Sequence, residues 1–352
     1  MQGGAAAGLV LAVVPGSGLL FALMLCAGIA GGYAARLVRV PRVIGFLLGG
    51  VALRYLLHAV LVEEGDAEAK AALAASAGPL RAVSDLALGM ILFTIGSVFE
   101  WTKLRTGGRA LWRQSLAEMA TVATFVTIAC AAAAWWTLSA AGGKEKIVLA
   151  VLLGIAAVAT APAATLFVLQ EYEAKGDVTN RILGLVGLNN IFCIVAFYLV
   201  FLLLALLGAV RTEPVAASAH WTAMALTTAG SVLLGLLLGL LLSWLYGRLA
   251  LTETLLLFFA SFLLLGAGEP WLWKHQGVSY NFLLAALVSG AVFANVAVDA
   301  TRLWESLRAI GTPIFAGFFV LAGYNLHLEE LRHMGILGGG YVLARTGGKV
   351  LG

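Results

Sequence analysis

Five polar side chains lie inside strongly apolar stretches of the sequence, where they could bind and exchange small cations. Asn189 and Asn190 are adjacent, and Thr160 lies two residues before a proline. Glu118 and Lys349 are isolated charges in two further apolar stretches. An amide oxygen can coordinate Na⁺ or K⁺ but cannot carry a proton, whereas a carboxylate and an amine can. Together these residues contain the groups that cation binding and proton exchange require.

Four of these candidates also have a purely structural interpretation. The two amides could join helices by hydrogen bonds worth about 0.6–2 kcal/mol each. Lys349 could extend to the membrane surface, and Glu118 could reach back to Arg113. At a rise of 1.5 Å per residue, Asn189, Glu118 and Lys349 all fall about 9–11 Å from the same edge of the membrane. Their similar depth is compatible with one shared site.

The elements that position these residues follow from the composition. Of the 352 residues, 61% are hydrophobic and 11% charged, and the mean hydropathy is +0.98. Soluble domains have about 45–50% apolar and about 25% charged residues. The apolar residues form separate runs of about 17–28 residues, long enough for helices that cross the hydrocarbon. A transmembrane barrel would instead show alternating polarity over about ten residues. The sequence therefore predicts an all-α membrane protein.

The apolar runs predict about eleven membrane spans, near residues 17–37, 41–61, 82–99, 112–140, 146–170, 181–209, 219–247, 252–268, 279–298, 308–322 and 335–352. The connecting segments alternate in basic content. Arg36, Arg39 and Arg42 follow the first span, whereas the segment after the second span contains several acidic residues, Glu64 among them. Because Lys and Arg concentrate on the cytoplasmic side of membrane proteins, the N-terminus is expected outside.

The fifth span contains a proline that a continuous helix would not tolerate easily. Pro162 removes one helical hydrogen bond and disfavours helical geometry at Ala161. We therefore expect a broken helix near residues 158–164, with Ala161, Pro162 and Ala163 at the break. Unpaired backbone at membrane depth is found where it is buried in protein or lines a wet cavity. The alternative is a simple proline kink.

Two parts of the sequence resemble each other at a distance of seven spans. Residues 96–108 match residues 323–335, and residues 43–50 resemble residues 282–290. Because seven is odd, the two copies would lie in opposite orientations, as in inverted-repeat transporters. We expect a first repeat in 1–210 with spans one to six, a linker helix in 211–250 and an incomplete second repeat in 251–352.

Six short motifs occur in a fixed order along the chain, at residues 40–50, 92–96, 160–165, 188–190, 314–323 and 348–349. Their order resembles the monovalent cation:proton antiporters of the sodium/hydrogen exchanger superfamily, especially the bacterial thirteen-helix type. The resemblance implies a bacterial inner-membrane protein in which two broken helices cross beside an acidic pair. That pair alternately binds a cation and protons, and one bundle moves against the other for alternating access.

The sequence departs from this family pattern in three places. Asn190 stands where the family has its ion-binding aspartate, with Asn189 before it, and Ala161 stands where many members have Asp. Either another carboxylate, of which Glu118 is the best placed, completes the proton cycle, or coupling is altered or lost. The sequence also stops at Gly352, before the expected second broken helix, so we expect the antiporter unit to be C-terminally incomplete.

The resemblance implies a secondary antiporter that exchanges H⁺ for Na⁺ or K⁺. Thr160, Asn189 and Asn190 would be transient cation ligands, and Lys349 and Glu118 would complete the ion pathway. The alternatives are a transport-dead antiporter-like scaffold or sensor, and a transporter of a small organic solute on a related fold.

Other functional classes find no support in the sequence. It contains no nucleotide-binding loop, no nucleophile constellation and no ligand-spaced His/Cys cluster. We therefore expect neither an enzyme, nor a bound cofactor, nor a nucleic-acid partner. The lipid bilayer is the expected surrounding. The small residues Gly235 and Gly239 could pack helices within one chain or join two chains into a homodimer.

Overall fold

The computed structural model describes residues 16–61, 75–76, 78–139, 142–206, 214–276 and 279–352. Within these residues the secondary structure consists of the short 3-10 helix Gly78–Leu80 and a series of α-helices. They are α2 (Ser17–Leu37), α3 (Arg42–Leu61), α5 (Arg81–Gly96), α6 (Trp101–Thr137), α7 (Gly143–Ala156), α8 (Pro162–Glu171), α9 (Asp177–Leu206), α10 (Pro214–Tyr246), α11 (Leu251–Gln276), α12 (Phe282–Val296), α13 (Thr301–Tyr324) and α14 (Leu328–Leu351). The predicted all-α fold is confirmed.

Eight stretches within the described residues are long and apolar enough to cross a membrane. They are Ser17–Leu37, Arg42–Val60, Gly78–Gly96, Gly108–Thr137, Asp177–Phe197, Ala225–Tyr246, Leu251–Leu272 and Thr301–Tyr324. The fifth predicted span is divided between α7 and α8, and α12 is a shorter apolar helix. The last predicted span corresponds to the part of α14 that follows a kink at Gly335, where φ is 50°.

The largest difference from the predicted boundaries is at α6. We expected this helix to begin near residue 112, but it begins at Trp101. The polar residues 101–111 are also helical. Lys and Arg favour helices in water, so a helix can continue beyond the apolar run. The hydropathy of the segment marks the end of the apolar run and not the end of the helix.

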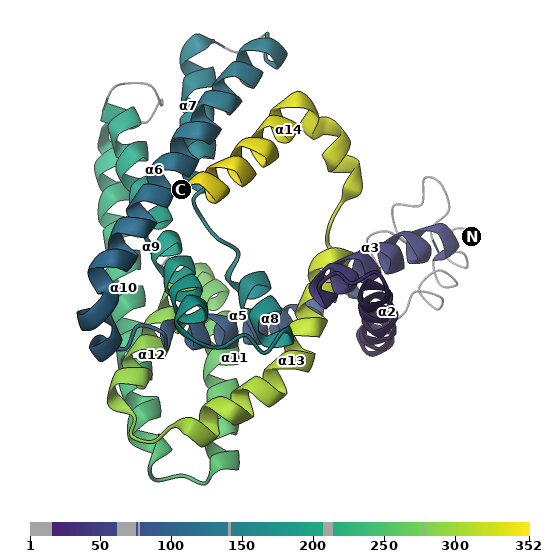
Figure 1. Ribbon diagram of the computed structural model, residues 1–352, viewed down its shortest axis with the longest axis vertical. Coiled ribbons are helices and arrows are strands. Elements are labelled where there is room, and N and C mark those ends of the chain that lie inside the picture. The colour runs from purple at the N-terminus through teal and green to yellow at the C-terminus, as the bar shows by residue number, and fades with distance from the viewer. Residues whose placement is uncertain (1–15, 62–74, 77, 140–141, 207–213, 277–278) are drawn as a thin grey trace.

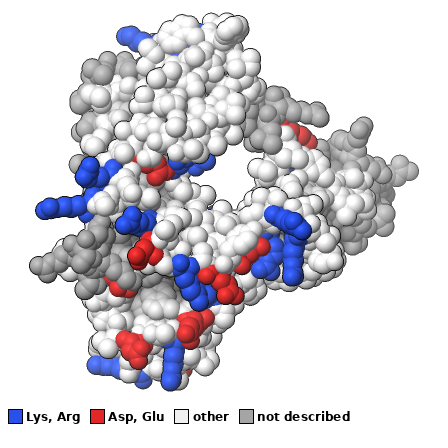
Figure 2. All heavy atoms as spheres, in the orientation of Figure 1, with Lys and Arg blue, Asp and Glu red and all other residues white. Residues whose placement is uncertain are grey.

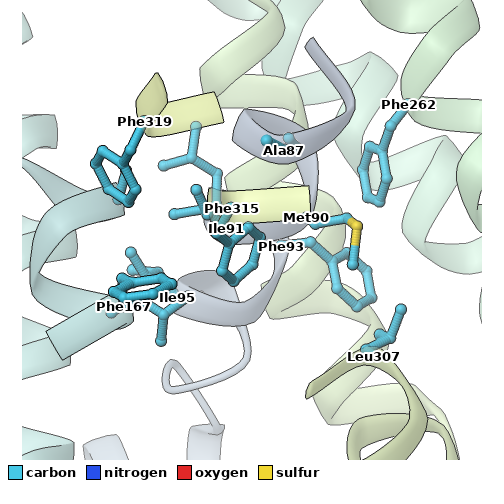
Figure 3. Close-up of a cluster of buried hydrophobic side chains, with 14 of the residues drawn as sticks. Ala87, Met90, Ile91, Phe93, Ile95, Phe167, Phe262, Leu307, Phe315 and Phe319 are labelled. Atoms are coloured by element: carbon cyan, nitrogen blue, oxygen red, sulfur yellow. The ribbon is translucent and has the colours of Figure 1, made fainter. Parts of the chain in front are cut away.

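The helices pack around two separate groups of buried side chains in the described residues. In the larger group, α5 is surrounded by α11, α12, α13 and α8 (Figure 1). The Phe93 ring of α5 lies 4.6 Å from the Phe258 ring and 5.5 Å from the Phe293 ring, measured between centroids. Figure 3 shows Phe93 beside Met90 and Leu307, and Ile91 near Phe315. The burial of α5 on several sides makes it the central helix of this group.

The smaller group lies between α6 and α7, with α14 packed against it. Its buried members are Val122, Val126, Cys130, Ala150, Ala157 and Val158. Residues of α14 cover it, and α14 packs along α6. Figure 1 shows α6, α7 and α14 together in the upper part of the molecule, away from α2, α11 and α13. The candidate residues of the sequence analysis lie in and around this second bundle.

Charged side chains are distributed unevenly over the face seen in Figure 2. Lys and Arg alternate with Asp and Glu across the lower half of the view, and the upper part is mostly uncharged. One ion pair joins α3 and α8, which both contribute to the larger group: Glu171 at the end of α8 accepts hydrogen bonds from Arg42 at the start of α3. The Arg42 backbone N–H lies 2.9 Å from Glu171 Oε2, and the Arg42 Nε lies 3.0 Å from Oε1.

Two glycines allow α3 and α13 to touch at the backbone. A Cβ at Gly50 would collide with the carbonyl oxygen of Val320, and a Cβ at Gly323 would collide with the carbonyl oxygen of Leu47. Each glycine therefore faces the carbonyl three residues before the other glycine. Only residues without a side chain permit this approach.

The crossing of α5 and α12 has the same reciprocal construction. A Cβ at Gly96 would meet the carbonyl oxygen of Leu287, and a Cβ at Gly290 would meet that of Phe93. Again each glycine faces the carbonyl three residues before its partner. We propose that these two crossings are equivalent parts of the predicted repeats, since they join the segments whose sequences resemble each other.

The small residues of α10 have a partner inside the chain. A Cβ at Gly235 would meet the carbonyl oxygen of Ala285, and one at Gly239 would meet that of Ser289, both on α12. These glycines therefore allow α10 to pack closely on α12. A homodimer remains a prediction, and these two residues do not supply its contact.

The substitution Gly290→Leu tests the α5–α12 crossing. A side chain at this position would overlap the Phe93 carbonyl, so we expect a loss of about 1–3 kcal/mol of stability and a lower melting temperature in detergent. Gly339→Leu is the matched control, because Gly339 of α14 is exposed and has no atom within 4 Å of an added Cβ. Equal melting temperatures for the two variants would contradict the close crossing.

Candidate ion site at the broken helix

The break in the fifth predicted span lies between α7 and α8. Helix α7 ends at Ala156 and α8 begins at Pro162, so the interruption expected within 158–164 covers residues 157–161. Ala161 is extended, with φ −67° and ψ 102°, as the residue before a proline prefers. Pro162 occupies the first position of α8, where its missing N–H is not needed. Ala163 is already helical and buried.

The break leaves three consecutive carbonyl groups without helical donors, and α14 supplies the donors. Arg345 donates from Nε to the Ala157 oxygen at 3.1 Å and from Nη2 to the Ala159 oxygen at 2.7 Å. Lys349, one turn further along α14, donates to the Val158 oxygen at 2.9 Å. The two cations also lie at the C-terminal end of α7, where the helix dipole favours positive charge.

The Lys349 amine lies inside the bundle and has three hydrogen-bond acceptors. Its Nζ atom lies 2.6 Å from Glu118 Oε1 and 2.6 Å from Thr160 Oγ1, in addition to the Val158 oxygen. A protonated lysine has three donors, so all of them are used. The side chains of Lys349 and Glu118 are 21% and 15% exposed. The structure therefore does not show Lys349 extending to the membrane surface.

Glu118 of α6 points towards Asn189 of α9 and not towards Arg113. Its Oε2 atom accepts a hydrogen bond of 2.9 Å from Asn189 Nδ2, while Oε1 accepts from Lys349. Asn189 is almost completely buried, and its Oδ1 accepts a 2.6 Å hydrogen bond from the hydroxyl of Ser115. Because a carboxylate only accepts, these contacts also fix which end of the Asn189 amide faces Glu118.

Asn190 connects α9 to the break in a different way. Its Nδ2 donates to the backbone oxygen of Thr160 at 2.9 Å and to that of Val186 at 2.8 Å. Backbone oxygens cannot donate, so the amide orientation is determined by chemistry. Among the described residues the Asn190 Oδ1 atom has no hydrogen-bond donor. It is an available oxygen beside the break.

The structure thus brings Thr160, Asn189, Asn190, Glu118 and Lys349 together, from α6, the break, α9 and α14. Two further residues of this site were not singled out from the sequence, Ser115 and Arg345. Ser115 lies one turn before Glu118, and Arg345 lies one turn before Lys349, so both share a helix face with a residue that was identified. That spacing was the available signal.

The geometry gives the site a defined chemistry. The Glu118 carboxylate is held by one ammonium group and one amide, so a cation that approaches it must compete with Lys349. The Thr160 hydroxyl oxygen accepts from Lys349 and lies 3.4 Å from Asn189 Nδ2. A proton leaving Lys349, or binding to Glu118, would remove one charge of the pair and change the balance of charge at the break.

A polar cavity of about 490 Å³ lies between α5, α8, α9 and α13, on the side where α8 ends and α9 begins. Its lining includes Thr94 of α5, Gln170 of α8, Asn180 of α9 and Arg308 of α13. The Gln170 Oε1 atom is buried and has no hydrogen-bond partner in the described residues. Leu183, two turns before Asn190 on α9, also lines the cavity.

Comparison with known proteins places the chain in a family. A solved structure with a similar fold is the sodium proton antiporter MjNhaP1 from Methanocaldococcus jannaschii. The TM-score is 0.57, the identity 16%, and the similarity covers 94% of this chain and 77% of that one. A search of curated proteins finds no match.

The model of the family described as sodium/hydrogen exchanger, transmembrane, matches residues 19–349. This match extends over nearly the whole chain and includes every residue of the site described above. The chain therefore belongs to the sodium/hydrogen exchanger family of transmembrane proteins.

Proposed function

We propose that this chain exchanges protons for Na⁺ or K⁺ across a membrane, with the site at the broken helix as the exchange site. The observation that supports this most directly is the Glu118–Lys349 pair beside Thr160 and Asn189. The family is one of transporters, and MjNhaP1, whose fold is similar, is a sodium proton antiporter. A carboxylate and an amine at the site supply the titratable groups that the two asparagines lack.

The cation would bind where Lys349 now donates. Glu118 and the Thr160 hydroxyl offer oxygens on one side, and Asn190 Oδ1 offers an uncommitted oxygen on another, while Asn189 holds the carboxylate in place. An arriving Na⁺ or K⁺ repels the Lys349 ammonium and competes for the same oxygens. Loss of one proton as one cation binds leaves the net charge of the site unchanged, which is the condition for a low-cost exchange inside the bilayer.

Alternating access would then move the helices that hold the ion site relative to the other helices. We propose that α6, α7, α8, α9 and α14 form the moving part, since they hold all the residues of the site. The polar cavity beside α8 and α9 would give water and ions access from one side. The Arg42–Glu171 pair joins the two parts on that side.

The membrane setting is part of the same proposal. The N-terminus would lie outside a bacterial inner membrane, because the basic segment between α2 and α3 belongs on the cytoplasmic side. The proposed domains are the first repeat in 1–210, the linker helix in 211–250 and the second repeat in 251–352. Under the alternative, a scaffold or sensor, the same site would hold its ion pair without exchanging it.

The substitution Glu118→Gln tests the proton carrier. The amide has nearly the shape of the carboxyl group but cannot titrate, so cation-dependent proton flux in proteoliposomes should fall to the level of empty liposomes. The protein should keep its elution profile in size-exclusion chromatography. Glu305→Gln on the exposed face of α13 is the control and should keep wild-type flux. Full flux in Glu118→Gln would show that the proton is carried elsewhere.

The substitution Asn190→Asp distinguishes an antiporter from a transport-dead protein. It places a second carboxylate beside the break, so it should increase the apparent affinity for Na⁺ or K⁺ and strengthen proton coupling in a wild type that is active. The measurement is proton flux as each cation is added in turn. If the wild type shows no flux and Asn190→Asp gains it, the natural protein is a scaffold or sensor and not an antiporter.

A further inference from the structure

An apolar groove lies between α2, α3 and α13, away from the ion site. It has a volume of about 460 Å³, and its lining is mostly aliphatic or aromatic, with glycines along α2. Ile29 and Tyr33 of α2 form one wall and are 73% and 65% exposed. Ala316 and Val320 of α13 form the opposite wall. A groove of this kind can hold a hydrocarbon chain.

One end of the groove is strongly basic. Arg36 and Arg42 line the groove and also line a second cavity of about 450 Å³, to which Arg39 and Tyr172 contribute. The two cavities are therefore adjacent, with Arg36 and Arg42 lining both. Arg36 and Arg39 are exposed, and in the described part of the chain neither guanidinium has a carboxylate or hydrogen-bond partner. Arg42 uses Nε for Glu171, which leaves its terminal nitrogens available.

The length of the groove matches one leaflet of a bilayer. Leu25, at its deep end, and Arg36, at its basic end, are separated on α2 by roughly 16 Å at 1.5 Å per residue. Half of a hydrocarbon core is about 15 Å. The arginines therefore lie at the level of lipid headgroups when the deep end lies near the bilayer centre.

We propose that this groove binds one acyl chain of an anionic phospholipid whose headgroup phosphate lies on Arg36, Arg39 and Arg42. Arginine binds phosphate oxygens through paired N–H groups, and anionic lipids gather in the leaflet that faces basic segments. The three arginines supply more positive charge than the single carboxylate of Glu171 can balance. This excess is what selects an anionic lipid over a zwitterionic one, and over an uncharged helix of a second copy.

The position of the headgroup has a consequence for the exchange cycle. Arg42 would donate from its terminal nitrogens to the headgroup while its Nε donates to Glu171. The lipid would therefore reinforce the contact between α3 and α8. This consequence rests on the proposed function, because lipid binding would change the transport rate only if α3 and α8 separate during the exchange cycle. Lipid binding itself can be measured without any transport activity.

Native mass spectrometry of the purified full chain tests the binding. Dioleoylphosphatidylglycerol and dioleoylphosphatidylcholine are added in turn, and the retained lipid is counted. Arg42 is already paired with Glu171, so at about 1 kcal/mol for each of the other two arginines the anionic lipid should be retained up to roughly thirty-fold better. The double variant Arg36→Gln, Arg39→Gln should remove this preference. Arg302→Gln is the matched control, since Arg302 is an exposed arginine at the start of α13, and should keep it.

Two variants test the acyl chain. Ala316→Phe and Ile29→Trp each narrow the groove and should reduce retention of both lipids; Ile29 is so exposed that its replacement leaves the fold intact. Equal retention of the two lipids by the wild type overturns the proposal. So does displacement of the lipid by inorganic phosphate, which identifies a site for free anions. Cross-linking between Ile29→Cys chains in phosphatidylglycerol vesicles identifies a second copy as the occupant and also overturns it.

Discussion

Carbonyl groups without helical partners inside an apolar bundle are the constraint around which the site is built. Pro162 ends the continuity of the fifth span and leaves the oxygens of Ala157, Val158 and Ala159 exposed to their surroundings. An unpaired carbonyl in such a medium costs several kcal/mol. Hydrogen bonds from charged donors contribute about 1.5–3 kcal/mol each. Arg345 and Lys349 together satisfy all three groups, so the broken span depends on α14 for its stability.

The chemistry of the site follows from this requirement. A lysine that serves a carbonyl inside the bundle introduces a positive charge, and a buried charge without a partner is strongly destabilising. Glu118 supplies the partner, and Asn189 and Ser115 orient the carboxylate and its neighbouring amide. The Glu118–Lys349 pair is thus directly bonded to the broken backbone. An aspartate at residue 190 is not needed to explain how the fold is held together.

Much of the fold could be predicted because its signals are local. The apolar runs mark the helices, and one proline marks the break to within a few residues. Depth along the helix axis indicated that Asn189, Glu118 and Lys349 lie at a similar level. The contacts themselves could not be predicted, because direction around a helix and the angle between helices depend on tertiary packing. Arg345 shows the limit: only the position of α14 reveals that it bonds the break. The roles of these residues in transport remain predictions.

The hydrogen bonds between Glu171 and Arg42 join a helix end to a helix that is 129 residues away in sequence. The carboxylate accepts from the first N–H of α3 as well as from the side chain, so separating α3 from α8 also leaves a helix terminus without its cap. The Arg42 side chain is 43% exposed and the Glu171 side chain 12%, so solvent reaches the pair mainly from the arginine side. Ion pairs that solvent reaches are worth about 1 kcal/mol. Mobile ions screen the pair over about 8 Å at physiological ionic strength. Raising the salt concentration should therefore weaken the side-chain part of this contact by up to roughly five-fold in its equilibrium constant, and leave the hydrogen bond from the helix N–H in place.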